Sequence, residues 1–246
     1  MVAQWRGCVV GAGGEARNPF ASLDMALPKS NLLVWPRAAV EAFVKLADER
    51  GQPSIGDAIV MMSWLGVRRQ DWLAWPADAF DRDLLAFRQE KTDRALVLPW
   101  SIVPPLAERI AATKARKLSD AVAATTFFHD RLGRPWPNHQ AFRKQFNLLR
   151  AELAKACPSF QTRYYVGMDP ADPLSIPTAA LTMRTMRHTC VTLNHDAGIS
   201  RELISGITGH EPESVDEVLA HYTARTADQA ARALNLRLAH EAKRTG

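Results

Sequence analysis

The chain has 246 residues, 47% of them hydrophobic, and a formal net charge of +5 at pH 7. This composition excludes a disordered or low-complexity chain, and the length fits one large globular domain or a domain with a short appendage. The positive charge is compatible with a nucleic acid partner, because phosphates attract Lys and Arg, but it does not by itself indicate one.

The three widely separated cysteines, Cys8, Cys157 and Cys190, fit neither a disulfide framework nor a zinc-binding pair. A reducing cytoplasm fits this pattern best. No apolar run approaches the roughly 20 residues that cross a membrane, and the N-terminus lacks a secretory apolar segment. We therefore expect a soluble cytoplasmic protein that makes no contact with a membrane.

Residues 1–30, rich in glycine, proline and small residues, are predicted to form a tail or linker before a domain at 31–246. Apolar residues at helical spacing begin after Pro36, whose missing N–H costs little in a first helical turn, and the pattern ends at Gly51. A second helix is predicted at about 54–66, with a short helical continuation after it.

Two short apolar runs at 84–87 and 95–98 flank a turn-like stretch at 90–93, which predicts a β-hairpin closed by Pro99. Further elements are expected as helices at about 103–113 and 142–153, a strand or loop at 121–128, a long proline-rich loop at 157–180, and three or four helices across 185–241. The predicted fold is α+β: mainly α with a small antiparallel β-sheet.

Residues suited to phosphate chemistry fall in separated segments. These are 65–71 (LGVRRQD), Lys91-Thr92 in the hairpin, 184–189 (RTMRHT), and 207–210 (ITGH), with Tyr222 twelve residues after the histidine. Taken together and in this order, the segments resemble the catalytic domain of the tyrosine recombinase (phage integrase) family. The resemblance covers about 31–235 and would imply that family's catalytic-domain fold.

Most segments match the family's pattern directly. The family has an arginine after a helix-ending glycine, with an acidic residue three positions on, as in Arg68 and Asp71. It has a lysine in a hairpin, as in Lys91. It has a Gly-His pair followed by a tyrosine, as in His210 and Tyr222.

Two features depart from that pattern. The family's His-x-x-Arg box, often followed by His-Thr, is matched at Arg187 and the two residues after it, but Arg184 stands where the family most often has histidine. We interpret Arg184 as taking over the histidine's contact with phosphate. The family also usually has an N-terminal DNA-clamping domain, whereas only residues 1–30 precede the match, which predicts a fragment or a reduced version that lacks this core-binding domain.

The resemblance implies a mechanism for cutting and rejoining double-stranded DNA. Arg68 and Arg187 would clamp a DNA phosphate through paired hydrogen bonds. Tyr222 would attack phosphorus to form a 3′-phosphotyrosine, and Lys91 would protonate the departing 5′-oxygen. His210 would donate a hydrogen bond to the phosphate or help move the tyrosine proton. No metal, ATP or other cofactor is implied.

The family resemblance also implies self-association as a tetramer on DNA and association with the nucleoid when DNA is bound. The segment Ala227–Arg244 is interpreted either as a helix packed on its own domain or as a helix donated to a neighbouring protomer.

Three rival functions remain open. Arg184 and the missing clamp domain favour a DNA-binding protein that keeps the fold without cutting. Asp81 and Asp83 are candidate carboxylates of a metal-dependent nuclease. A relaxing topoisomerase would use the same phosphotyrosine chemistry.

Several residues also have simpler interpretations. Lys114 could serve in place of Lys91, and Asp71 is expected to orient Arg68 or cap a helix. His188 is expected to pack or hydrogen-bond behind Arg187, because no HExxH motif or Cys pair supports a zinc site.

The other two tyrosines, Tyr164 and Tyr165, lie in the proline-rich loop with no Gly-His pair upstream. They are interpreted as packing or DNA-contact residues.

Overall fold

The structure of the chain is a computed structural model that describes residues 33–119, 124–163, 174–220, 234, 235 and 237. All of these belong to one compact unit, Leu32–Gly246. The predicted tail at 1–30 and the segment 227–244, apart from three of its residues, lie outside the described residues.

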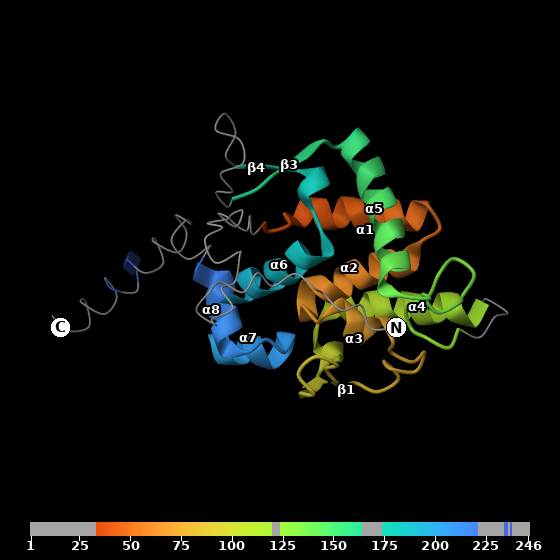
Figure 1. Cartoon of the computed structure of the whole chain (residues 1–246), viewed down its shortest axis with the longest axis horizontal. Helices are drawn as coiled ribbons and strands as arrows, with labels where there is room; N and C mark the ends of the chain where they lie inside the picture. The colour runs from red at the N-terminus through yellow and green to blue at the C-terminus, as the bar shows by residue number, and fades with distance from the viewer. Residues whose placement is uncertain (1–32, 120–123, 164–173, 221–233, 236, 238–246) are drawn as a thin grey trace, which may run out of the picture. The chain divides into compact units, whose positions relative to one another are not determined.

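The first two helices of the described chain pack on each other and provide much of the core. Helix α1 (Arg37–Glu49) begins after Pro36, which occupies the N-cap position rather than the first turn. Helix α2 (Pro53–Leu65) packs along α1 (Figure 1) and also contacts α4 and α6. Because neighbours cover it on several sides, most of its residues are buried. It ends at Gly66, which adopts the left-handed conformation typical of helix C-termini.

A short helix and a hairpin follow α2. Helix α3 (Arg69–Leu73) leads toward strands β1 (Leu85–Arg88) and β2 (Ala95–Leu98), which pair antiparallel with Leu85 opposite Leu98. The turn between the strands contains Asp93 in the left-handed region, with φ 51°. The predicted hairpin is therefore confirmed.

The middle of the chain supplies two long helices. After a 3₁₀ turn, η1 (Trp100–Ile102), helix α4 (Pro104–Ser119) extends beyond the predicted end at 113 and packs on α2. Helix α5 (His139–Ala156) begins at Asn138, whose side chain accepts hydrogen bonds from the backbone N–H groups of Gln140 and Ala141. It packs against α1 and α3 through Phe142, Phe146, Leu149 and Leu153.

One prediction in this region was wrong. The segment 157–180, expected to be a long loop, contains strands β3 (Ser159–Gln161) and β4 (Ser175–Pro177), which pair as a second antiparallel sheet, followed by the 3₁₀ turn η2 (Thr178–Ala180). Pro177 is compatible with this sheet because it is the last residue of β4, where the strand ladder needs no further N–H donor. In the described part of 121–128, which was predicted as a strand or a loop, Thr126 makes an isolated bridge to Pro76 and no strand forms, as the loop alternative expects.

The described chain after η2 is helical. Helix α6 (Met183–Asp196) starts with a capping box between Thr182 and Thr185, in which each side chain binds the other's backbone. Helix α7 (Arg201–Thr208) is capped by Ser200 and ends at left-handed Gly209, and helix α8 (Pro212–Ala220) packs on both α6 and α7. The predicted mainly α fold with small antiparallel sheet structure is confirmed, with two two-stranded sheets in place of one.

Aromatic side chains dominate the main core. Trp72 lies with Phe128 and Phe142 at ring-centroid distances of 4.8 and 5.1 Å, both in edge-to-face geometry. A smaller apolar cluster joins α6, α7 and α8 through Val191, Ile204, Val215, Val218 and Leu219. None of the described helices is long and apolar enough to cross a bilayer.

Candidate active site

The end of α2 brings three distant segments together at Gly66. This residue has φ 57°, and a Cβ placed on it would lie 3.0 Å from Cys190 Sγ and 3.0 Å from Thr208 Cγ2. A glycine is therefore required both for the backbone conformation and for the close approach of α6 and α7. Its carbonyl accepts a hydrogen bond of 2.5 Å from Nη1 of Arg187, so the helix end fixes that guanidinium.

Arg187 also binds His210. Its Nε donates to Nε2 of His210 at 2.9 Å, and both side chains are more than nine-tenths buried. Nδ1 of His210 lies 2.7 Å from the hydroxyl oxygen of Thr208, and that hydroxyl donates to the carbonyl of Ile204. Because Arg187 has only donors and the Thr208 hydrogen is already committed, the His210 proton must sit on Nδ1.

Electrostatics agree with this neutral ring. Burial, followed by the positive charges of Arg187, Arg68 and His188, lowers the pKa of His210 to about 3. Burial and then the charge of Arg68 lower the pKa of Arg187 to about 9, so Arg187 still carries its charge at neutral pH. Arg68, Arg187 and His210 therefore lie close enough to feel one another's charge.

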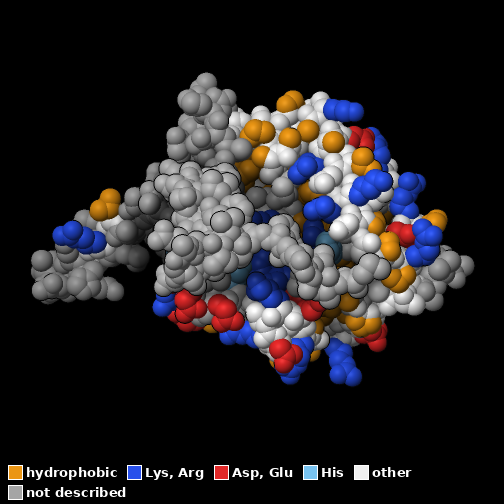
Figure 2. All heavy atoms as spheres, viewed as in Figure 1, with side chains coloured by type: hydrophobic (Ala, Val, Ile, Leu, Met, Phe, Trp, Pro, Cys, Tyr) orange, Lys and Arg blue, Asp and Glu red, His pale blue; other side chains and the backbone are white. Residues whose placement is uncertain are grey.

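Arg68 reaches the same place from the N-cap position of α3. Its Nη1 donates to Oε1 of Gln89 at 3.1 Å, and the Thr92 hydroxyl donates to the same oxygen at 2.9 Å. Figure 2 shows Lys and Arg side chains gathered near the centre of the face that it presents. Arg68 is half-buried, so part of its guanidinium is accessible to a ligand.

Asp71 connects α3 to the hairpin rather than capping a helix. Its Oδ1 accepts a hydrogen bond of 3.1 Å from the backbone N–H of Glu90. Burial raises the pKa of Asp71, and the nearby charges of Arg68 and Arg187 partly oppose that shift. The structure thus places Asp71 beside both arginines, where it holds the hairpin against α3.

The structure brings Arg68, Arg187 and His210 together, whereas the side chains of Lys91 and Arg184 are exposed and, in the described part of the chain, make no hydrogen bond or ion pair with these three residues. Lys91 occupies the hairpin turn between Glu90 and Thr92, and both neighbours are anchored by the hydrogen bonds above. Arg184 lies in the first turn of α6, three residues before Arg187, so the two share one side of the helix.

Tyr222 lies outside the described residues. The chain leaves the described part at Ala220, the last residue of α8. Tyr164 and Tyr165 also lie outside it.

The fold was compared with known proteins. No protein-family model matches the chain, and no curated protein sequence matches it. The crystal structure of XerA recombinase aligns with a TM-score of 0.56 and 15% identity over 90% of this chain and 68% of XerA. A lambda integrase dimer bound to a COC′ core site aligns with a TM-score of 0.60 and 15% identity over 84% of this chain and 53% of the integrase.

The Tn1549 transposon integrase in complex with transposon right end DNA aligns with a TM-score of 0.58 and 18% identity over 88% of this chain and 68% of that one. The chain has the tyrosine recombinase fold. It spans 53% to 68% of the length of these three proteins.

Two residues that the sequence analysis did not select organise the centre of this tyrosine recombinase fold. Gln89 is 1% exposed and contacts Arg68, Thr92 and the backbone at Gly209, where an added Cβ would lie 2.1 Å from its Nε2. A signal was present, because the alternation of β1, continued one residue past its end at Arg88, puts Leu85, Phe87 and Gln89 on the same side.

Arg94 fastens the other side of the hairpin. Its Nη1 donates to the Ser205 hydroxyl at 3.3 Å and to the carbonyl of His210 at 3.2 Å. The Ser205 hydroxyl donates to that same carbonyl. Nothing in the sequence spacing indicates this bridge, because it joins residues more than a hundred positions apart.

The alternative residues lie elsewhere in the tyrosine recombinase fold. Lys114 donates a hydrogen bond to the carbonyl of Phe80 at 2.6 Å and forms an ion pair with Asp81 at 2.9 Å. The lysine considered as a substitute for Lys91 is therefore paired with one of the two carboxylates considered for a nuclease. Asp83 is exposed. Within the described ranges, no three His, Cys, Asp or Glu side chains are grouped to hold a metal ion.

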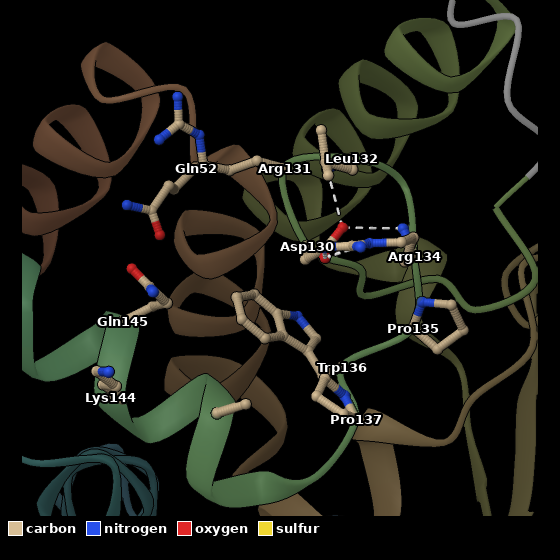
Figure 3. A pocket seen from close by; sticks show the side chains of 11 residues that line it. Gln52, Asp130, Arg131, Leu132, Arg134, Pro135, Trp136, Pro137, Lys144 and Gln145 are labelled. Atoms are coloured by element: carbon tan, nitrogen blue, oxygen red, sulfur yellow. Dashed lines mark hydrogen bonds and ion pairs between the residues drawn. The ribbon is translucent and has the colours of Figure 1, made fainter.

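A separate hollow lies at the opposite end of α2. Figure 3 shows Gln52, Trp136 and Gln145 around a pocket of about 770 Å³, with Asp130 paired to Arg134 at its edge. Because α2 has 13 residues, about 20 Å of helix separates this pocket from Gly66. The pocket is therefore distinct from the arginine cluster.

Proposed function

We propose that this chain is a site-specific DNA recombinase or integrase of the tyrosine recombinase family, which cleaves and rejoins double-stranded DNA through a covalent tyrosine intermediate. The observation that carries the proposal is the convergence of Arg68, Arg187 and His210 at the end of α2. In this arrangement Nη2 of Arg187 is buried and has no hydrogen-bond partner among the described residues. A buried guanidinium nitrogen without an acceptor calls for a ligand, and a phosphate oxygen supplies one.

The two arginines suit a phosphodiester. Arg187 is already held by Gly66 and His210 through two of its nitrogens, which leaves Nη2 to meet a non-bridging oxygen. Arg68 presents its accessible donors beside it. Charge that develops on the equatorial oxygens would then meet cations fixed before the reaction begins, an effect worth about 10²–10³ in rate per donor.

The proposed reaction balances as one displacement. The oxygen of Tyr222 attacks phosphorus, the bond from phosphorus to the 5′-oxygen breaks, and a 3′-phosphotyrosine forms. Lys91 gives a proton to the departing 5′-oxygen, and the tyrosine proton leaves by way of His210 or solvent. Arg184 supplies a further cation to the phosphate. Because the phosphoester energy is kept in the covalent link, rejoining by the reverse step needs neither ATP nor a metal.

The position of α8 supports the assignment of Tyr222. This helix packs on α6, which carries Arg187, and on α7, which leads into His210. Tyr222 follows two residues after its end. A tyrosine hydroxyl has an ordinary pKa of about 10, so a cluster of cations is the environment that would activate it.

The proposal extends to assembly and location. The similar solved structures include a lambda integrase dimer bound to a COC′ core site and a lambda integrase tetramer bound to a Holliday junction. By analogy, this chain would assemble as a tetramer on DNA in the cytoplasm, with Ala227–Arg244 as the segment passed between protomers.

A nicked suicide DNA tests the function, because the short cleaved strand diffuses away and traps the covalent adduct. Wild-type protein is expected to form the adduct with and without EDTA, whereas the Tyr222→Phe variant forms none and the Tyr164→Phe control behaves as wild type. Cleavage that EDTA abolishes and Tyr222→Phe retains would support a metal-dependent nuclease instead. DNA binding without any adduct would support the non-cutting protein.

A further inference from the structure

A second pair of arginines lies beside the proposed phosphate clamp. Arg69 directly follows Arg68, but it belongs to the side of α3 that faces α5. Trp72, three residues further along α3, packs edge-to-face on Phe142 of α5 at 5.1 Å, and residues three apart share one side of a helix. Arg143 follows Phe142 on α5 and is exposed.

The two guanidinium groups repel each other. Burial and then the charge of Arg143 lower the pKa of Arg69, so the pair is close enough for its like charges to interact. Nε of Arg69 is buried without a hydrogen-bond partner in the described part of the chain. Neither arginine forms an ion pair with a described carboxylate, unlike Arg109, which pairs with Asp48 and Asp57.

The surface next to Arg143 is a groove along α5 that cationic and amide side chains line together with Ala141 and Leu148. A hollow of about 590 Å³ runs along the exposed side of α5, with Asn138, Gln140, Arg143, Lys144 and Asn147 among its lining residues and no carboxylate. Cations and amides without acids make a surface that suits an extended anion.

We propose that Arg69 and Arg143 together form a subsite for one DNA backbone phosphate, adjacent to the phosphate held by Arg68 and Arg187, with the α5 groove guiding the same strand. The inference rests on the proposed function, because it takes DNA as the ligand. Arg68 and Arg69 have neighbouring Cα atoms about 3.8 Å apart, and their side chains point toward different elements. The start of α3 would thus bind two adjacent phosphates of one DNA strand. These two contacts would fix which phosphate is cleaved.

The salt dependence of DNA binding tests the subsite. Each phosphate contact contributes about −0.9 to the slope of log affinity against log salt concentration. Arg69→Gln and Arg143→Gln are each expected to make that slope shallower by about 0.9 and to weaken binding roughly tenfold. The double variant is expected to lose no further slope, because both arginines hold one phosphate. Lys155→Gln, about 18 Å along the same helix from Arg143, is the matched control and should keep the wild-type slope.

A chemical substitution in the DNA locates the contact. Replacing single phosphates by uncharged methylphosphonates should identify a position, next to the cleaved phosphate, that weakens wild-type binding but not binding by the double variant. Thermal unfolding without DNA checks folding: both single variants are expected to be at least as stable as wild type, because a like-charge repulsion is removed.

The outcomes separate this inference from the proposed function. Wild-type slopes in both arginine variants, with covalent cleavage intact, would overturn the subsite and leave the function standing. Shallower slopes in a protein that never forms an adduct would support the subsite and overturn cleavage. A wild-type protein that does not bind DNA would overturn both.

Discussion

Nε of Arg187 donates a hydrogen bond to Nε2 of His210 across 2.9 Å, and this contact fixes the state of both side chains. It makes Nε2 an acceptor and leaves the imidazole neutral with its proton on Nδ1. His210 can therefore donate from Nε2 to a phosphate only after Arg187 releases it and the ring gains a proton or changes tautomer.

Another cation is not expected to replace the planar guanidinium of Arg187. Arg187→Lys would keep a positive charge but lose the geometry that serves His210, Gly66 and a phosphate oxygen at once. Single-turnover cleavage of the nicked DNA should fall by about 10²–10³. Arg184→Lys, one helical turn away and exposed, is the matched control and should lose less than about tenfold. Equal losses in the two variants would contradict the distinct role of Arg187.

His210 gives stability a defined pH dependence. Its pKa falls from 6.5 to about 3 on folding, so between these values the unfolded chain binds a proton that the folded protein does not. The stabilisation is therefore complete above about pH 6.5 and is lost as the pH falls toward 3. His210→Gln keeps an oxygen that can accept from Arg187 but does not titrate.

Urea unfolding at several pH values between about 7 and 5 measures this effect. The wild-type free energy of unfolding should fall more steeply than that of His210→Gln, by at most about 1.4 kcal/mol per pH unit. Parallel curves for the two proteins would mean that folding does not change the pKa of His210.

Two glycines three residues apart should respond in opposite ways to alanine. Gly209 has φ 64°, and its added Cβ would lie 2.1 Å from Gln89 Nε2, so Gly209→Ala is expected to destabilise the protein by roughly 2–4 kcal/mol. Gly206 lies within α7, and nothing is within 4 Å of its added Cβ. Gly206→Ala is therefore expected to stabilise by about 0.5–1 kcal/mol. Denaturant unfolding of both variants measures these changes. An unchanged free energy of unfolding in Gly209→Ala would contradict the packing of Gln89 on this turn.

Gln89 is expected to act as a positioning residue. Gln89→Leu keeps the volume but removes the oxygen that accepts from Arg68 and Thr92. Cleavage should fall by at least about tenfold while the urea midpoint changes little, because the lost hydrogen bonds are to groups that water can reach. Gln70→Leu, exposed and two residues after Arg68, serves as control. A Gln89→Leu enzyme with the wild-type rate would exclude the positioning role.

The sequence predicted much of the fold because its local signals are strong. Gly66 ends the helix predicted at about 54–66, and two short apolar runs on either side of a polar turn define the hairpin. The small β3–β4 sheet was missed, because strands of three residues carry too little periodicity to distinguish from a loop.

The sequence predicts the site residues that belong to motifs. It does not predict the residues that join the site only through tertiary contacts. Motif spacing indicates Arg68, Arg187 and His210, and the structure brings the three side chains together. The central position of Gln89 and the bridge from Arg94 to the His210 carbonyl depend on packing between segments far apart in sequence, which no local pattern encodes. The pairing of Arg69 with Arg143 has the same origin, since it follows from the contact of α3 with α5.

Peptide mapping of the trapped adduct identifies the nucleophile. The chain has three tyrosines, so protease digestion and mass spectrometry of the protein trapped on nicked DNA can identify which one carries the nucleotide. We expect a 3′-phosphate linked to Tyr222 in the wild-type protein. An adduct on Tyr164 or Tyr165, or DNA that is bound and cut without any linked tyrosine, would contradict it.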